Sequence, residues 1–181
     1  AAQPLLSGRL PWAADTLIHL YRLVELDHLL RQGYVFSRWA PDLAYGFGFP
    51  LFNFYAPLSY YAAEMFRLIG MDFSPALLAT FVAFVVGAGL SMYLWTAEIF
   101  GRHAGLVAAA AYVTAPYLLY NVYHRGALAE VLAMALMPAI LWAITRLART
   151  GSPQFFALTA LLYAALPLSH NITWLIFTPV V

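Results

Sequence analysis

Residues 73–97, with the sequence FSPALLATFVAFVVGAGLSMYLWTA, decide the fold class of this chain. The stretch contains no charged side chain, and it is longer than the roughly 20 apolar residues that a helix needs to cross a bilayer. Similar stretches cover residues 104–123, 126–145 and 150–169, and a further apolar run starts at residue 171. We therefore expect four membrane spans and the start of a fifth, in a bundle that covers residues 73–181.

The composition fits a membrane protein and excludes a soluble one. Of the 181 residues, 64% are hydrophobic and 9% are charged, whereas a soluble domain has about 45–50% apolar and about 25% charged residues. Intrinsic disorder is excluded as well, because it requires low hydrophobicity. The expected fold class is an all-α integral membrane protein, with interfacial amphipathic helices and a multi-span helical bundle.

Charge and cysteine content exclude several kinds of site. The nine basic residues are all arginine and the formal net charge is +1, so the chain has no basic surface of the kind that binds nucleic acid. The absence of lysine excludes a Schiff base and a P-loop. The absence of cysteine excludes disulfides, zinc–thiolate sites and thiol catalysis.

The loops predict an orientation in the membrane. Three arginines lie in the short loops at residues 98–103 and 146–152, and both loops lie on one side because two spans separate them. Arginine in short loops favours the cytoplasmic side. We therefore expect the turns near residues 124 and 170 on the outer face of the cytoplasmic membrane.

Residues 1–72 form a separate segment that we expect on this outer face. Residues 4–33 show a helical period, with a start signalled by Pro11 and Asp15 and an end at Gly33, which predicts an amphipathic helix lying in the interface. Asp27 and Arg31 are four residues apart and predict an ion pair on that helix. The apolar stripe of the helix consists of Leu17, Leu20, Tyr21 and Val24, whereas Asp15, His19 and Arg22 occupy another face.

Residues 43–63 determine on which face Asp15 lies. The stretch has no charge, so hydropathy alone predicts a span, but it contains Gly46, Gly48, Pro50 and Pro57. Proline removes a backbone donor, and unpaired backbone groups cannot face lipid. We expect an irregular, aromatic-rich re-entrant segment that returns to the same face, followed by a short helix at residues 58–68. A span here would put Asp15 on the opposite face.

Two groups of residues in the first segment could carry chemistry. Asp15 and His19 lie one helical turn apart and could act as general base and orienting group, or as two ligands of a divalent metal. The alternative is that they belong to a solvated helix face. Arg38, Trp39 and Asp42 could bind a phosphate or a sugar hydroxyl, with the indole as a stacking surface, or Arg38 and Asp42 could form a pair that holds the loop.

A third group lies at the turns between the spans. Glu130 is an acid inside a span, which is costly and therefore suggests function. Arg125 is its expected partner, in either a functional or a purely structural pair. His124 lies in the same turn, and His170 lies at the turn before the last apolar run.

Several strings together resemble a known family. They are ADTLIHLYR at 14–22, RWAPDL at 38–43, GFGFPLFNFYAPLSYY at 46–61, APY at 115–117, and RGA at 125–127 followed by Glu130. They resemble the bacterial multi-spanning membrane proteins labelled "6-pyruvoyl-tetrahydropterin synthase-related". The architecture is also similar to GT-C membrane glycosyltransferases, a resemblance that implies polyprenyl-phosphate sugar donors and Asp15 as the catalytic base or metal-linked carboxylate.

Three functions follow as hypotheses. In a glycosyltransferase, Asp15 would deprotonate the acceptor with support from His19, the cationic groups Arg38, Arg125 and His124 would hold the lipid phosphate, and Glu130 would orient Arg125. The chain could instead be a non-catalytic accessory subunit that binds other membrane subunits. A transporter for a lipid-linked sugar is the third hypothesis.

Overall fold

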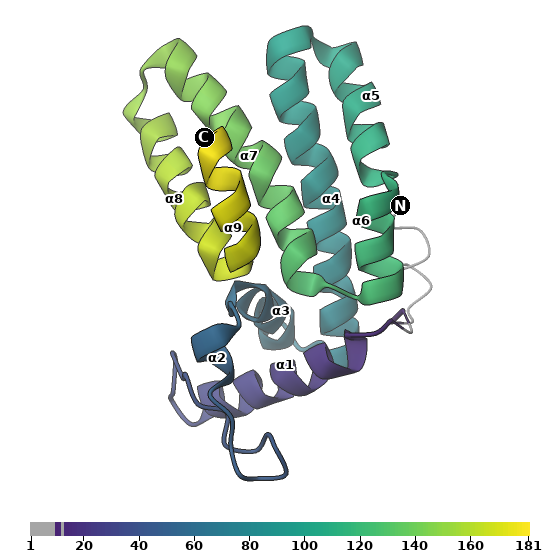
Figure 1. Ribbon diagram of the computed structural model, residues 1–181, viewed down its shortest axis with the longest axis vertical. Coiled ribbons are helices and arrows are strands. Elements are labelled where there is room, and N and C mark those ends of the chain that lie inside the picture. The colour runs from purple at the N-terminus through teal and green to yellow at the C-terminus, as the bar shows by residue number, and fades with distance from the viewer. Residues whose placement is uncertain (1–9, 12) are drawn as a thin grey trace.

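The computed structural model describes residues 10–11 and 13–181 of the chain, and these residues form two layers (Figure 1). Long helices run side by side in a bundle, and three shorter helices lie across one end of it. In the described part of the chain, the only β-type pairing is an isolated bridge between Ala40 and Phe49. The expected all-α fold is therefore confirmed.

Three helical runs are long and apolar enough to cross a membrane. They are α4 at Phe73–Phe100, the run Arg102–Arg125, and α7 at Leu128–Thr150. The next helix, α8 at Pro153–Ser169, has 17 residues and is shorter. The last apolar run contains α9 at Asn171–Phe177 and a 3₁₀ turn, η3, at Thr178–Val180. Spanning by α8 and by the last run therefore stays a prediction.

The run Arg102–Arg125 is not one continuous α-helix. It divides into α5 at Arg102–Val113, α6 at Pro116–Tyr120 and a π-helical turn, η2, at Asn121–Arg125. The break comes at Ala115, whose ψ of 134° is extended. The ring of Pro116 disfavours helical geometry in the residue before it. The span expected at residues 104–123 is thus present as a run of sufficient length and hydropathy, with a break at Ala115.

Apolar packing and a few polar contacts hold the long helices together. Phe81 of α4, Leu118 of α6 and Leu128 of α7 are fully buried in one core. The Ser91 hydroxyl donates to the Ala135 carbonyl at 2.9 Å, and the Tyr112 hydroxyl donates to the Met134 carbonyl at 2.8 Å. These two bonds join α4 and α5 to α7, which lies between them and α8 (Figure 1).

The two ends of the bundle carry different charged groups. At the end remote from α1, Glu98 of α4 forms ion pairs with Arg146 at 3.4 Å and with Arg149 at 2.9 Å. The α4–α5 and α7–α8 connections meet at this end, whereas the α6–α7 and α8–α9 connections meet at the end that α1 covers (Figure 1). The cytoplasmic location of the first end stays a prediction.

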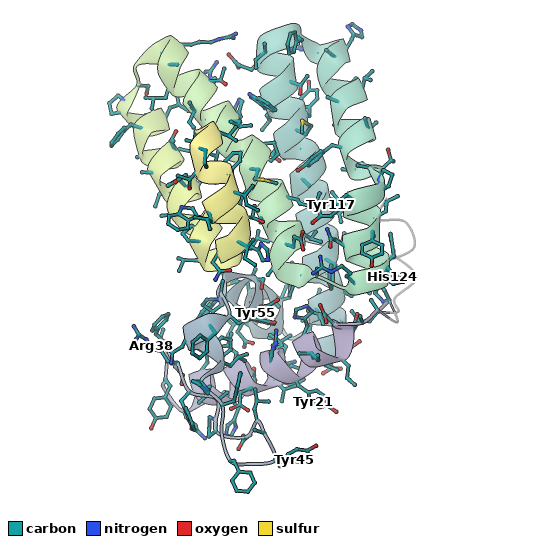
Figure 2. The ribbon with its side chains drawn as sticks, viewed as in Figure 1. Tyr21, Arg38, Tyr45, Tyr55, Tyr117 and His124 are labelled. Carbon is teal, nitrogen blue, oxygen red and sulfur yellow. The ribbon has the colours of Figure 1, made fainter. Side chains whose placement is uncertain are left out.

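Helix α1, at Thr16–Arg31, lies across the end of the bundle and contacts it through its partly polar face. His19, Leu23 and Leu26 are buried, while Leu17 and Tyr21 of the expected apolar stripe are exposed. Figure 2 shows Tyr21 pointing away from the bundle. The apolar stripe is therefore not the face that packs on the rest of the chain.

Between α1 and α4 the chain forms no helix of spanning length. Ala40 and Phe49 exchange two backbone hydrogen bonds of 2.8 and 2.9 Å, which close a loop whose tip carries Tyr45. Helix α2 is a single turn at Leu51–Phe54, and α3 occupies Leu58–Leu68, the range expected from the sequence. Both helices lie at the same end of the bundle as α1 (Figure 1), so Asp15 and Arg125 share that end.

Candidate functional site

The N-terminal end of α1 is joined to the turn between α6 and α7 by main-chain hydrogen bonds. The amide of Ala14 donates to the His124 carbonyl at 3.1 Å, and the amide of Asp15 donates to the Arg125 carbonyl at 2.8 Å. Gly126 ends the turn with a φ of 69°, a left-handed conformation that suits glycine. A Cβ on Gly126 would lie 2.8 Å from the Thr16 hydroxyl oxygen, so only glycine lets α1 approach this closely.

Asp15 is partly exposed at the start of α1. Its side chain makes no capping hydrogen bond, although aspartate at this position commonly accepts one from the first helical turn. The Asp15 charge acts on Tyr55, which lies between α2 and α3. The carboxylate is thus not used to begin the helix, and it lies near the aromatic side chains that pack on α1.

His19 and Arg22 converge on one hydroxyl group, that of Tyr60. The Tyr60 oxygen lies 2.6 Å from His19 Nδ1 and accepts a 3.3 Å hydrogen bond from Arg22 Nη1. Because a guanidinium can only donate, the Tyr60 oxygen accepts from Arg22, and its short contact with Nδ1 brings His19 to the same hydroxyl group. The Arg22 guanidinium also lies 4.2 Å from the centre of the Tyr55 ring.

Burial controls the protonation of this cluster. His19 is 1% exposed, and desolvation, with a smaller effect of the Arg22 charge, lowers its pKa to about 4. Burial also raises the pKa of Tyr60. The Gly126 backbone partly opposes the shift of the His19 pKa, and Nε2 is buried with no hydrogen-bond partner among the described residues. His19 therefore connects α1 to α3 through Tyr60, and its buried ring can position the helix that carries Asp15.

Arg125 and Glu130 form the expected pair. Arg125 Nη1 donates to Glu130 Oε2 at 2.7 Å and to Asn121 Oδ1 at 2.9 Å. The Tyr117 hydroxyl donates to the other Glu130 oxygen. The Arg125 side chain is 41% exposed. Nε and Nη2 of Arg125 have no hydrogen-bond partner among the residues that the structure describes, so they are available to an anionic group.

The two histidines at the turns have separate environments. His124 is exposed and stacks on Tyr120, with ring centres 4.7 Å apart and an angle of 13°. His170 Nδ1 accepts a 3.3 Å hydrogen bond from the Thr173 amide and so caps α9. Burial lowers the pKa of His170, the Glu130 charge opposes this shift, and the Arg125 charge adds to it. His170 thus lies within electrostatic range of the Arg125–Glu130 pair.

Arg38, Trp39 and Asp42 do not join this site. Figure 2 shows Arg38 in the lower layer and His124 at the opposite side of the view, at the end of the bundle. Arg38 lies 5.9 Å from the Phe36 ring centre, and the Asp42 carboxyl group lies 3.9 Å from His28 Nε2. The alternative of an Arg38–Asp42 pair is not found among the described residues, because the Asp42 backbone is fixed to α1 by a 3.2 Å hydrogen bond to Glu25.

A second charged cluster joins α1 to α3. The expected Asp27–Arg31 pair is present at 2.7 Å, and Arg67 of α3 lies 3.7 Å from the other Asp27 oxygen. Arg31 lowers the pKa of Asp27, whereas burial, reinforced by Asp27, raises the pKa of Glu64 to about 7. The pKa values of the Asp27 and Glu64 carboxyl groups are thus shifted in opposite directions where α1 packs on α3.

Sequence reasoning missed several members of the site. Asn121 lies four residues before Arg125, a helical spacing that could have identified it. Tyr117 and Tyr60 carry no comparable signal, because their partners are 13 and 41 residues away. Within residues 10–11 and 13–181, no group of three or more His, Cys, Asp or Glu side chains could hold a metal. Asp15 and His19 have no third ligand there.

An apolar cavity adjoins the Arg125–Glu130 pair. It has a volume of about 240 Å³, lies between α6, α7 and α9, and has Glu130 and Thr173 as its polar lining residues. The remaining lining side chains are Tyr117, Met134, Met137, Ile176, Phe177 and Val180. The cavity could hold part of a hydrocarbon chain whose polar end reaches Arg125.

Comparison with known proteins identifies relatives of this chain. A family model described as "6-pyruvoyl-tetrahydropterin synthase related domain; membrane protein" matches residues 52–181. A protein of Lactococcus lactis subsp. cremoris (strain MG1363), named "Uncharacterized protein", is 24% identical over 186 aligned residues. The alignment covers 100% of this chain and 30% of that protein, so the chain spans less than a third of its relative. No solved structure matches the chain.

Proposed function

This chain belongs to the 6-pyruvoyl-tetrahydropterin synthase related family of membrane proteins, and we propose that it forms the donor site of a membrane glycosyltransferase. The donor would be a sugar linked to a polyprenyl phosphate. One observation carries the proposal: the Asp15 amide is hydrogen-bonded to the Arg125 carbonyl, and the Arg125–Glu130 pair adjoins a cavity suited to a lipid chain.

Each group has a defined task in this proposal. The cavity between α6, α7 and α9 takes the first part of the prenyl chain. The free N–H groups of Arg125 donate to the phosphate, and Glu130 and Asn121 hold the guanidinium in place. Asp15 receives the proton of the acceptor hydroxyl. His19 is a positioning residue, because it fixes α1 through Tyr60.

The chemistry requires a cation at the leaving group. The acceptor oxygen forms a bond to the anomeric carbon while the bond from that carbon to the phosphate oxygen breaks. The phosphate leaves with an additional negative charge, which Arg125 stabilises in a site of low dielectric constant. The acceptor proton passes to Asp15, so that charge and atoms balance.

The test compares two conservative variants of the full-length protein in its membrane. Asp15→Asn keeps the size of the side chain and removes the base, and we expect transfer of radiolabelled sugar from the polyprenyl phosphate to fall by about 100-fold or more. Asp72→Asn is the matched control, because Asp72 is an exposed residue before α4 with no capping hydrogen bond. Equal transfer by native protein and Asp15→Asn would refute the proposal.

The same assay separates the alternative functions. Arg125→Lys retains the charge but loses the planar donor array that stabilises the leaving phosphate, so kcat should fall and donor KM should rise. A native protein that binds the donor and releases it unchanged across the membrane would be a transporter. Activity that appears only with other subunits present, and that survives Asp15→Asn, would make this chain an accessory subunit.

A further inference from the structure

A second pocket lies at the other end of α1, away from Arg125 and the cavity beside it. It has a volume of about 300 Å³, at the small end of the range for ligand pockets. Its lining residues are Leu29, Gln32, Tyr34, Ser37, Trp39 and Pro41. None of these side chains is charged. The pocket therefore suits a small neutral ligand rather than a phosphate.

Trp39 is held firmly in this pocket. Its neighbour Ala40 is bonded to Phe49 by the two backbone hydrogen bonds of the bridge. Gly48 packs against the indole so closely that a Cβ there would lie 2.4 Å from the ring. The indole nevertheless remains 50% exposed and lines the pocket. It is thus a preorganised flat surface, which lowers the entropic cost of binding a ligand against it.

The polar groups around the indole are oriented as acceptors. The Ser37 hydroxyl donates its proton to the Trp39 carbonyl at 2.6 Å, which leaves the lone pairs of its oxygen free. Gln32 Nε2 is engaged with His28 at 2.7 Å, which leaves Gln32 Oε1 as an acceptor. Two fixed acceptors beside an aromatic face match a ligand with several hydroxyl donors and one apolar face.

From this arrangement we infer that the Trp39 pocket binds the pyranose ring of a neutral sugar. The C–H face of the ring stacks on the indole, and its hydroxyl groups donate to Ser37 and Gln32. Arg38 takes no part, because its guanidinium lies over Phe36 outside the pocket. The inference does not depend on the proposed transfer reaction, since it concerns recognition of a glycan at a separate place.

Binding can be measured without turnover. The full-length protein in lipid nanodiscs is titrated with soluble mono-, di- and trisaccharides of hexoses and N-acetylhexosamines, with saturation-transfer difference NMR as the readout. We expect at least one saccharide to bind, with saturation strongest on the C–H protons of one ring face. Trp39→Ala should weaken binding about tenfold or more, and Trp39→Phe should restore part of the affinity.

Two control variants locate the effect. Tyr45→Ala removes a fully exposed ring from the tip of the same loop, outside the pocket, and should leave the affinity unchanged. Asp15→Asn should also leave it unchanged, which separates this site from the proposed catalytic one. Gln32→Ala removes one acceptor from exposed helix surface without touching the loop, and should weaken binding several-fold.

Three results would overturn the inference. The first is a native protein that binds no saccharide of the panel. The second is equal affinity of native protein and Trp39→Ala. The third is burial of the indole in lipid. The fluorescence of Trp39 is obtained by subtracting the signal of Trp39→Phe from that of native protein. Strong quenching of this difference signal by brominated lipids would place the indole in the bilayer, and the pocket would then not be a sugar site.

Discussion

At the scale of single residues, the Tyr60 hydroxyl holds α1 against α3 through its contacts with His19 and Arg22. Tyr60→Phe leaves His19 Nδ1 buried without its hydrogen-bond partner and removes an acceptor from Arg22. We expect a loss of about 1–3 kcal/mol in the free energy of unfolding, the usual cost of a buried polar group without its partner. Urea or thermal unfolding in detergent measures it.

Tyr61→Phe is the matched control for that variant. The Tyr61 hydroxyl donates to the Val35 carbonyl at an exposed site, where water replaces the lost partner. Its effect should be within about 0.5 kcal/mol, as for most surface substitutions. Equal effects of the two variants would show that the His19–Tyr60 contact contributes little to the junction.

Glu64 and His19 should make stability depend on pH in opposite directions. The pKa of Glu64 rises from 4.5 to about 7, so the native state binds the proton more tightly and stability falls as pH rises through this window. The pKa of His19 falls from 6.5 to about 4, so stability rises with pH between these values. In native protein the effect of Glu64 partly cancels the effect of His19. In Glu64→Gln the free energy of unfolding should therefore rise more steeply from pH 4 to 6.5.

Unfolding curves at successive pH values check this expectation. The control is Ser91→Ala, which removes the buried hydrogen bond from α4 to the Ala135 carbonyl; it carries no titratable group and should lower stability without changing the slope between pH 4 and 6.5. A Glu64→Gln profile parallel to that of the native protein would contradict the assignment.

At the scale of elements, Gly126 sets how closely α1 approaches the bundle. Gly126→Ala adds a Cβ 2.8 Å from the Thr16 hydroxyl and 3.1 Å from the Ala13 Cβ. Gly151→Ala is the control, since Gly151 has a similar φ of 61° and open space around it. The control should lose about 1 kcal/mol of stability from backbone strain. Gly126→Ala should lose more, together with protection of the α1 amides from hydrogen exchange.

The sequence predicted some elements well because their signals are local. The bounds expected for α3 follow from Pro57 and Gly70 on either side of a helical pattern, and α4 follows from a long uncharged stretch. The orientation of α1 could not be read in this way. Its apolar stripe suggested one buried face, but the partners of the other face, Tyr60 and Arg67, lie in α3 and come together with it only in the tertiary fold.

The candidate site shows the same division. The Arg125–Glu130 pair follows from a spacing of five residues across a turn and is present. Arg38 and Asp42 have a similar spacing, yet the pair is absent, because Asp42 is held by Glu25 and His28 of α1. Spacing predicts contacts within a helix or tight turn, whereas loop residues take partners that the rest of the fold supplies.

At the scale of the whole molecule, the arrangement of the two ends predicts a labelling pattern. Single cysteines placed at exposed positions 42 and 124 should react with an impermeant maleimide from the outer side of the membrane. Cysteines at positions 103 and 152 should react from the cytoplasmic side, where the arginine-rich loops are expected. The chain contains no cysteine of its own, so the background within it is clean.

Two outcomes of the labelling are informative. Reaction of positions 42 and 124 from opposite sides would contradict the shared end that places Asp15 beside Arg125. Reaction of all four positions in the reversed pattern would retain the fold and invert its orientation, which would place the proposed transfer on the cytoplasmic face.

The union of α1 with the bundle has a consequence for how this family can vary. Ala14 and Asp15 are attached to the turn through main-chain amides and carbonyls, and every amino acid except proline supplies an amide. The side chains at positions 14, 15 and 124 can therefore change without loss of the hydrogen bonds that hold α1 on the bundle. Evolution can exchange the chemistry displayed at this end of the bundle while the scaffold that presents it stays in register.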